Sequence, residues 1–226
     1  MAGSIYERLN GLSMFTGLIQ AICTVRSARS AHGTMLLTID LGELARDVKI
    51  GDSIAVSGVC LTISQISGSC AAFEVSSETL AKTTIGGLKP QSKVNAESAL
   101  KPTDRFGGHF VQGHIDGTAT VRAVERQGQF ADIKFAAGPE LLSQIVVKGS
   151  VAVDGVSLTI AAMDRTAFTV AVIPQTLKAT TLGTAKPGDL VNIETDIIVK
   201  TVQKQLENML PQTGELSVER LKELGF

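Results

Sequence analysis

The side chains best suited to chemistry occur as two matching pairs of small polar groups. Cys60 and Thr62 are two residues apart in the run GVCLTI, and Ser157 and Thr159 have the same spacing in the run GVSLTI. Residues two apart on a strand share a face, so we expect each pair to line one surface. Thiols and hydroxyls donate and accept hydrogen bonds, which suits ligand binding and proton transfer. The alternative is that both pairs are core or barrel-rim residues that a duplication has kept.

Three further positions could either hold a ligand or serve the fold alone. Glu78-Thr79 and Gln175-Thr176 each follow a predicted strand, where such side chains cap a turn or hydrogen-bond to a ligand. His114 has no histidine counterpart in the other half of the chain. A lone histidine is commonly structural, but a difference between two repeated halves is also where a catalytic role would be found.

Several common types of site are absent from the sequence. GVSLT begins like a nucleophile elbow but lacks its closing glycine, and neither a P-loop nor a GxGxxG motif occurs. His109 and His114 would point to opposite faces of one extended strand, which argues against joint metal binding. Cys23, Cys60 and Cys70 form an odd set without CxxC spacing, which disfavours disulfides and zinc. We therefore expect no metal site and a reducing, cytoplasmic environment.

The elements that must position these groups are repeated along the chain. SETLAKTTIGGLKPQSKVNAE, residues 77–97, returns as PQTLKATTLGTAKPGDLVNIE, residues 174–194, with ten identical positions out of 21. GVCLTI returns as GVSLTI with five identities in six, and FTGLI, residues 15–19, has a weaker echo in VQGHI, residues 111–115. A shift of about 97 residues is too long for a solenoid repeat, so each copy is a domain and the boundary is expected near residue 110.

Composition restricts the class of protein. The 226 residues are 44% hydrophobic, which is enough to bury a core. The net charge of -1 and the aromatic content of 4% disfavour nucleic-acid binding, which normally uses a basic surface and stacking rings. No run reaches the roughly 18 apolar residues that cross a bilayer, so no membrane partner is expected.

Short strands separated by turns account for most of each copy. The segments predicted as strands are 53–56, 61–63, 72–75 and 93–97 in the first copy, and 151–153, 158–160, 168–172 and 190–193 in the second. This pattern indicates an all-β fold, either small closed barrels or sandwiches. Short helices or turns are expected at 43–48 and 139–146, a helix of about 14 residues after Asp196, and a weak second helix at 217–224.

The motifs MFTGLI, GVCLT, GVSLT, GGHFVQGHID and PQTLKATTLG together resemble those of the riboflavin synthase family, and the resemblance covers about residues 14 to 226. It implies two tandem homologous six-stranded Greek-key β-barrels, at 14–110 and 111–199. A C-terminal α-helix and tail at 200–226 would hold a homotrimer together. Family chains usually begin at the methionine of MFTG, whereas here residues 1–13 form an N-terminal extension ahead of Met14.

The activity implied by the resemblance is a dismutation. One molecule of 6,7-dimethyl-8-ribityllumazine gives a four-carbon unit to a second one, which yields riboflavin and 5-amino-6-ribitylaminouracil. Each barrel would bind one lumazine, and the active site would form between the N-terminal barrel of one subunit and the C-terminal barrel of its neighbour. No cofactor would be needed, and association with lumazine synthase is a further possibility that the family raises.

The residue roles implied by the resemblance fall into two groups. Ser157 and Asp196 would activate or stabilise the nucleophile, His114 and Cys60 would assist proton transfer, and Ser53 completes the catalytic set. The positions that would bind the ring and the ribityl chain are Gly17, Leu18, Ile19, Cys60, Leu61, Thr62, Glu74, Val75, Ser76, Ser77, Glu78, Thr79, Gly113, His114, Ile115, Lys148, Asp154, Ser157, Leu158, Thr159, Ala171, Val172, Ile173, Pro174, Gln175 and Thr176.

Two other functions compete with the enzyme. A non-catalytic protein that binds lumazine or flavin would have the same double barrel, and a duplicated barrel could also be an interaction module. The presence of Cys60, His114, Ser157 and Asp196 favours the enzyme.

Overall fold

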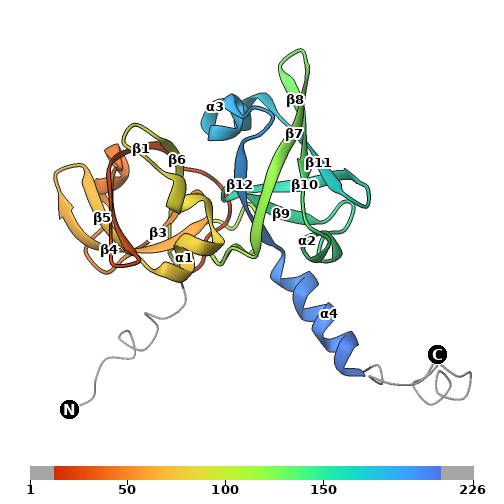
Figure 1. Ribbon diagram of the computed structural model, residues 1–226, viewed down its shortest axis with the longest axis horizontal. Helices are drawn as coiled ribbons and strands as arrows, with labels where there is room; N and C mark the ends of the chain where they lie inside the picture. The colour runs from red at the N-terminus through yellow and green to blue at the C-terminus, as the bar shows by residue number, and fades with distance from the viewer. Residues whose placement is uncertain (1–12, 210–226) are drawn as a thin grey trace, which may run out of the picture.

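Two closed antiparallel β-barrels lie side by side, and one helix projects from the second barrel (Figure 1). The computed structural model describes residues 13–209, so the weak helix expected at 217–224 and all but the last residue of the N-terminal extension lie outside the described range. The predicted all-β class, with two six-stranded barrels and a C-terminal helix, is confirmed.

The two barrels have the same strand connectivity. The first closes in the order β1-β2-β5-β4-β3-β6, and the second closes in the equivalent order β10-β11-β8-β7-β12-β9. The first barrel contains β1 (Ala21–Ala31), β2 (Thr34–Asp40), β3 (Ser53–Val56), β4 (Val59–Ser67), β5 (Cys70–Val75) and β6 (Lys93–Ser98). The second contains β7 (Gly117–Gln127), β8 (Phe130–Ala136), β9 (Ser150–Val153), β10 (Val156–Met163), β11 (Ala167–Val172) and β12 (Leu190–Thr195).

Short helices connect the strands at matching places in the two barrels. They are η2 (Gly42–Arg46), α1 (Ser77–Lys82) and η3 (Thr84–Gly87) in the first barrel, and α2 (Pro139–Ser143), α3 (Pro174–Ala179) and η4 (Thr181–Thr184) in the second. The turns expected at 43–48 and 139–146 are therefore single turns of helix. Proline is the first residue of both α2 and α3, where its fixed φ suits a helix start and its missing N–H is not needed.

Side chains fill the interior of each barrel. Alternate residues of every strand point inward, and the inward residues form one separate hydrophobic cluster per barrel. Phe73 is fully buried in the first cluster, and Phe135 stacks on Phe168 in the second with ring centroids 5.2 Å apart. A filled interior leaves ligands only the outer surface of the barrels or the openings between strands.

Each half of the chain packs a residue against the core of the other half. Ile19, which precedes β1, packs against the core of the second barrel, and Ile115, which precedes β7, packs against the core of the first. Phe15 and Val111, which come shortly before these two isoleucines in the chain, form an antiparallel bridge and are both fully buried. The segments that lead into the two barrels are therefore exchanged in a nearly two-fold symmetric way.

Two buried asparagines connect the barrels. The Asn95 side chain donates to the Asp154 carbonyl at 2.9 Å and accepts from the Thr181 N–H at 2.8 Å. Asn192 makes the equivalent bonds, donating to the Ser57 carbonyl and accepting from the Thr84 N–H, both at 2.8 Å. Because each amide satisfies backbone groups of the opposite barrel, the relative position of the barrels is fixed by directional bonds as well as by packing.

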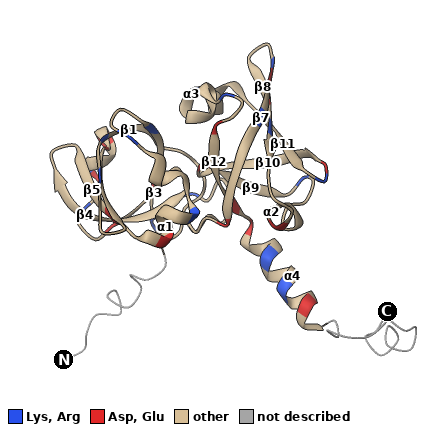
Figure 2. Ribbon diagram, viewed as in Figure 1, with Lys and Arg blue, Asp and Glu red and all other residues tan. Residues whose placement is uncertain are grey.

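The C-terminal helix α4 (Ile197–Met209) stands away from both barrels (Figure 1). It begins after Asp196, whose carboxylate accepts the Ile198 N–H at 2.9 Å. Its apolar residues Ile198, Val202, Leu206 and Met209 are 55%, 54%, 53% and 60% exposed. The charged residues of the helix are Lys200, Lys204 and Glu207 (Figure 2). Within residues 13–209, no helix is long and apolar enough to cross a membrane.

Candidate active site

Each barrel has an opening where two neighbouring strands separate. The β4–β5 ladder ends at Ile63 and Phe73, and the β10–β11 ladder ends at the equivalent pair, Ile160 and Val170. Beyond these pairs β4 and β10 each keep one strand partner, β3 and β9, whereas β5 and β11 lead into α1 and α3. One side of each opening is therefore a strand and the other side is the start of a helix.

The polar pairs found in the sequence line the strand side of these openings. Cys60 and Ser157 are partly buried, and Thr62 and Thr159 are exposed, so each pair has one sheltered and one accessible group. Leu61 and Leu158, between them, point into the barrel cores. The expectation that each pair shares one outward face is confirmed by this alternation.

A glycine segment from the opposite half completes each opening. The Cys60 N–H donates to the Gly113 carbonyl at 2.9 Å, and the Ser157 N–H donates to the Gly17 carbonyl at 2.9 Å. A Cβ on Gly113 would lie 2.5 Å from the Cys60 Cβ, and one on Gly17 would lie 2.6 Å from the Ser157 Cβ. Both glycines have φ near +78°, at +79° and +77°, so only glycine allows this approach.

Buried carboxylates hold the two glycine segments in place. Glu97 accepts from the Thr16 N–H and hydroxyl, both at 2.7 Å, and from the Gly17 N–H at 2.9 Å. Glu194 accepts from the N–H groups of Gln112 at 2.7 Å and Gly113 at 2.9 Å. Burial raises the pKa of both carboxyls, that of Glu194 to about 7, while the N–H donors act against it. These residues were identified in the sequence only as members of the repeat, without a role.

The first-barrel opening contains a thiol and two hydroxyls. Burial raises the pKa of the Cys60 thiol, and the nearby Ser53 hydroxyl acts in the opposite direction. The Ser53 Oγ also accepts a 2.6 Å hydrogen bond from the Ser13 Oγ. His114, in the glycine segment that closes this opening, is exposed.

The second-barrel opening contains a hydroxyl and an imidazole. The Ser157 Oγ lies 2.7 Å from His109 Nδ1, and the backbone N–H of His109 donates to the Thr16 carbonyl at 3.2 Å. Burial lowers the pKa of His109, and the charge of Asp196 acts in the opposite direction, so the ring is neutral at pH 7. The His109 Nε2 is buried and has no hydrogen-bond partner among the described residues. The hydrogen-bonding capacity of this nitrogen is therefore unused among the described residues.

His109 is the main residue of the site that sequence reasoning missed. The sequence singled out His114 because its counterpart, Leu18, is apolar, and treated His109 only as half of an improbable metal pair. Neither histidine lies in a strand, so the alternation argument used for them does not apply. The repeat does align His109 with Ser13, as it aligns His114 with Leu18, and this second mismatch would have drawn attention to it.

The helix side of each opening holds the remaining predicted binding segments. Ser76 caps α1, its hydroxyl accepting from the Thr79 N–H at 3.2 Å, and Glu78 pairs with Lys82 at 2.9 Å on the helix surface. Ser77 and Glu74 are exposed there, and Val75 is buried in the core. In the second barrel Ala171, Ile173 and Gln175 are exposed, Pro174 and Thr176 are partly buried, Val172 is buried, and Lys148 is exposed at the turn before β9.

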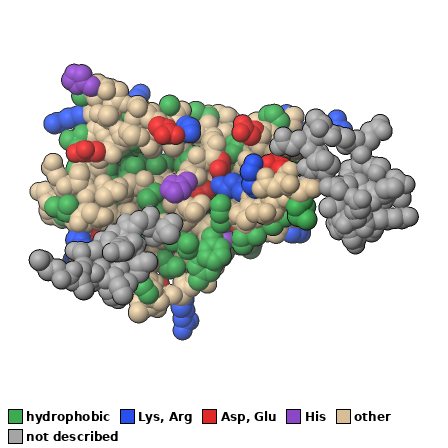
Figure 3. Space-filling view, turned by 90° about the horizontal axis from the view of Figure 1, so that it is seen from below, with side chains coloured by type: hydrophobic (Ala, Val, Ile, Leu, Met, Phe, Trp, Pro, Cys, Tyr) green, Lys and Arg blue, Asp and Glu red, His purple; other side chains and the backbone are tan. Residues whose placement is uncertain are grey.

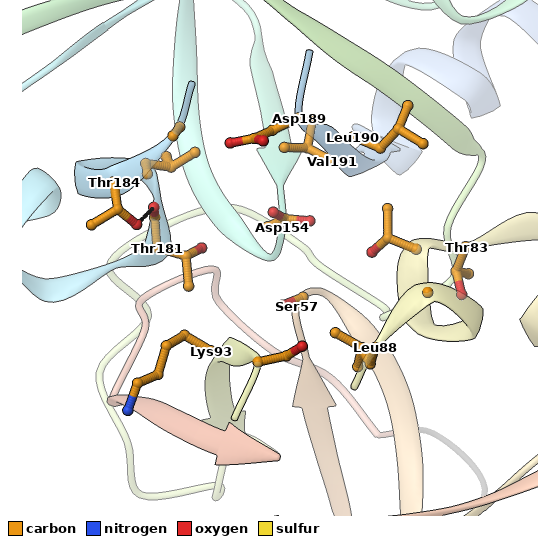
Figure 4. Close-up of a pocket in the computed structure, with 15 residues that line it drawn as sticks. Ser57, Thr83, Leu88, Lys93, Asp154, Thr181, Thr184, Asp189, Leu190 and Val191 are labelled. Carbon is orange, nitrogen blue, oxygen red and sulfur yellow. Dashed lines mark hydrogen bonds between the residues drawn. The ribbon is translucent and has the colours of Figure 1, made fainter. Parts of the chain in front are cut away.

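Asp154 is placed apart from the other predicted binding residues. It lies at the turn between β9 and β10, where its carboxylate accepts the Asn192 N–H at 2.8 Å. It lines a cavity of about 630 Å³ between the two barrels, together with Ser57, Thr181 and Asp189 (Figure 4). No other residue of the predicted binding set lines this cavity. Burial, reinforced by the charge of Asp189, raises the pKa of Asp154 to about 7.

The described residues offer donors for organic ligands. Between residues 13 and 209, no group of three or more His, Cys, Asp or Glu side chains is arranged to hold a metal ion. The arrangement provides two separate openings, each with a flanking strand, a helix start and a glycine segment contributed by the other half. Such a pair of equivalent openings suits two molecules of the same kind.

The model of the lumazine binding domain matches the chain twice, at residues 16–99 and 112–196. The chain is 38% identical over 215 residues to the riboflavin synthase of Actinobacillus pleuropneumoniae, which covers 94% of this chain and 100% of that protein. It is 39% identical over 217 residues to the riboflavin synthase of Bacillus subtilis, again with 94% and 100% covered. The chain belongs to the riboflavin synthase family.

Solved structures share the double barrel of this riboflavin synthase family member. LumP complexed with riboflavin matches with a TM-score of 0.74 and 25% sequence identity over 80% of this chain and 98% of that chain. LumP complexed with 6,7-dimethyl-8-(1'-D-ribityl) lumazine matches with a TM-score of 0.74 at 24% identity, with the same coverage. The two matches to the lumazine binding domain fall on the two barrels, so the strand and helix sides of each opening belong to one copy of that domain and the glycine segment belongs to the other.

Proposed function

We propose that the two openings are the half-sites in which this transferase carries out the reaction of riboflavin synthases. A four-carbon unit passes from one 6,7-dimethyl-8-ribityllumazine to another, and the products are riboflavin and 5-amino-6-ribitylaminouracil. A dismutation of two like molecules requires two like pockets, and the duplicated barrel supplies them. The observation that carries the proposal is the equivalence of the two openings, down to the glycine that touches Cys60 in one and Ser157 in the other.

The helix side and the glycine segment of each half-site bind the substrate in this proposal. Exposed hydroxyl and carboxylate groups at Ser77, Glu78 and Thr62 in the first barrel match the donor and acceptor needs of a ribityl chain. Gln175 and Thr159 occupy the equivalent places in the second barrel. Holding two reactants in contact can lower a barrier by roughly 7 to 11 kcal/mol, so orientation is the main contribution expected from the protein.

Proton transfer is assigned to the polar groups at the sheltered end of each half-site. A neutral His109 beside Ser157 can accept a proton from the hydroxyl, which makes the oxygen a better base or hydrogen-bond partner for the bound ring. Asp196 favours the charged imidazolium that would form. Cys60 serves the first half-site, and His114, at its exposed edge, can exchange protons with solvent.

The assembly that we propose is a homotrimer joined through α4. The exposed stripe Ile198, Val202, Leu206 and Met209 repeats at helical intervals along one side of α4 and needs an apolar partner. Seen from the side on which α4 projects, further hydrophobic side chains are exposed in the middle of the molecule (Figure 3). In such a trimer the first barrel of one subunit would meet the second barrel of its neighbour and bring the two half-sites together.

Sedimentation tests the assembly. The double variant Val202→Asp with Leu206→Asp is expected to sediment as a smaller species than the wild type, because two charges would be buried in the joint. Gln205→Asp, between them, is the matched control and should leave the trimer intact. A double variant that still sediments as a trimer would refute the role of α4.

The reaction itself is tested by mixing the purified chain with 6,7-dimethyl-8-ribityllumazine and following flavin absorbance. Appearance of riboflavin with one 5-amino-6-ribitylaminouracil per flavin supports the proposal. Binding of the lumazine without turnover would instead identify a non-catalytic lumazine- or flavin-binding protein. Cytoplasmic location and association with lumazine synthase complete the proposal, and cell fractionation and co-sedimentation with purified lumazine synthase test them.

A further inference from the structure

One sheltered ion pair connects a side chain of α4 to the barrels. Lys200, in the first turn of α4, donates to both carboxylate oxygens of Asp116, at 2.9 and 2.8 Å. Both side chains are only 22% exposed, whereas Lys204 and Glu207, which pair farther along the helix, are 70% and 56% exposed. Because the helix dipole disfavours a cation in the first turn, a lysine at this position is stabilised by an external anion.

Asp116 ends the segment that closes the first half-site. It follows His114 by two residues, and its backbone N–H donates to the Ile193 carbonyl at 2.9 Å. Its carboxylate also accepts the N–H and the hydroxyl of Thr195, both at 2.8 Å. Asp116 is therefore held on β12 at two points. We propose that Asp116 and Lys200 are a positioning pair, which fixes the direction of α4 and the end of the His114 segment together.

The first barrel shows that the bonds of Asp116 to the last strand do not require its charge. Gln20 occupies the equivalent position, and its backbone N–H donates to the Ala96 carbonyl at 3.0 Å. Its side-chain oxygen accepts the N–H and the hydroxyl of Ser98 at 2.9 and 2.8 Å. A neutral amide oxygen thus makes the same bonds at the end of the strand. The second barrel differs in that a helix follows the strand, and the lysine of that helix needs an anion.

The pair restricts a movement that the start of the helix leaves free. The Asp196 carboxylate caps α4 by accepting the Ile198 N–H, but this bond lies within the first turn and does not stop the helix from swinging about its base. No residue of α4 is buried, so packing does not fix its direction within the chain. The Lys200 bond to a separate segment does. The apolar stripes of several subunits can meet only if every α4 leaves its barrel in the same direction, so the inference deepens the proposed function and rests on it for the trimer and for turnover.

Hydrogen exchange of the full chain, followed by mass spectrometry, tests the pair directly. Lys200→Met keeps the length of the side chain and removes its charge, so the protection of amides in residues 113–116 and 195–201 is expected to fall by about three- to tenfold. Asp116→Asn keeps an oxygen for the Thr195 bonds and loses only the charge, and it should have the same effect. Lys200→Arg, which keeps the charge, should restore the protection.

A double-mutant cycle separates a direct pair from general loosening. If the two side chains act through each other, Lys200→Met combined with Asp116→Asn should lower the protection no further than either change alone. Lys204→Met is the matched control, because it removes the same charge from an exposed pair one turn farther along α4 and should leave the protection unchanged. Unchanged protection in either single variant, additive effects of the two, or an equal effect of Lys204→Met would overturn the inference.

Assembly and turnover distinguish this inference from the proposed function. If the wild type is an active trimer, Lys200→Met should dissociate at a protein concentration about three- to tenfold higher in sedimentation and should lower kcat/KM severalfold, whereas Lys204→Met should match the wild type. If the wild type neither forms a trimer nor converts lumazine, the proposed function fails, and the exchange measurements still decide whether the pair holds α4. If the wild type is an active trimer and Lys200→Met changes none of these readouts, this inference alone fails.

Discussion

The two half-sites share a backbone frame and differ in the side chains placed on it. In both, a carboxylate of the last strand holds a glycine segment against the strand of the opposite barrel. The sheltered groups differ, since the first barrel has the thiol of Cys60 with Ser53 and Ser13, and the second has Ser157 with His109. Duplication thus kept the parts that shape the opening, while the groups that can move protons diverged. At the sheltered end, an imidazole lies beside the strand residue in the second half-site, whereas the histidine of the first half-site, His114, is at its exposed edge.

The largest expected effect comes from removing that imidazole. His109→Gln keeps a hydrogen-bonding group beside Ser157 but cannot accept a proton, so the rate of riboflavin formation should fall by about 10² to 10³. Cys60→Ser in the other half-site should cost about tenfold. Lumazine binding, followed by fluorescence, should survive in both variants and shows that they are folded. Equal losses in the two variants would mean that the half-sites are not chemically distinct.

The glycines test the shared frame. Gly17→Ala and Gly113→Ala each place a Cβ within 2.6 Å or less of another side chain at a positive φ, so both should lower the free energy of unfolding by about 2 to 4 kcal/mol. Gly33→Ala, at φ +81° with nothing within 4 Å, isolates the backbone strain and should cost about 1 kcal/mol. Urea unfolding measures all three. A similar cost at Gly33 would show that contact between the halves contributes little.

A smaller difference between the barrels is expected in the dependence of stability on pH. Ser57 and Asp154 occupy equivalent turns at φ 42° and 44°, but only Asp154 ionises. Burial raises its pKa from 3.8 to about 7, so the folded protein retains a proton that the unfolded chain releases. The stabilisation is complete below about pH 4 and is lost as the pH rises towards 7, with a slope of up to about 1.4 kcal/mol per pH unit.

Asp154→Ser, which introduces the residue that the first barrel has at this turn, should remove the contribution of Asp154 to the pH dependence of stability. Glu194, whose pKa burial raises from 4.5 to about 7, acts with the same sign and remains. The variant should therefore retain a shallower fall in stability between about pH 4.5 and 7. Urea unfolding at pH 5, 6, 7 and 8 measures the slopes, and Ser57→Ala is the control that should leave the wild-type slope unchanged. Identical slopes in the wild type and Asp154→Ser would contradict the prediction.

The smallest effect is expected on the helix side of the first half-site. Glu78 forms an exposed ion pair with Lys82, so Glu78→Gln should leave the unfolding midpoint unchanged. The substitution makes this position like Gln175 of the second barrel. If Glu78 accepts a ribityl hydroxyl, lumazine should bind about two- to fivefold more weakly, as titration by fluorescence would show. Unchanged affinity would remove Glu78 from the binding set.

Strand patterns were readable from the sequence where a short run of apolar residues lies between turn residues. Ser53–Val56 was predicted with the bounds that the structure shows, because a short apolar run between turn residues has few other interpretations. The strands β1, β2, β7 and β8 were not located. β1 reads AICTVRSARSA, is rich in small and charged residues, and contains a bulge between Val25 and Ser27 that breaks the alternation.

The sequence by itself determined that there are two equivalent domains with matching polar pairs, because duplication leaves identities at a constant spacing. It also determined the helix after Asp196, because helical periodicity is local. Only the tertiary structure decided that Gly17 contacts Ser157, that Gly113 contacts Cys60, and that His109 joins the second half-site while Ser13 joins the first. A repeat shows which positions are alike, but which halves touch depends on packing between residues far apart in the chain, and no local pattern encodes it.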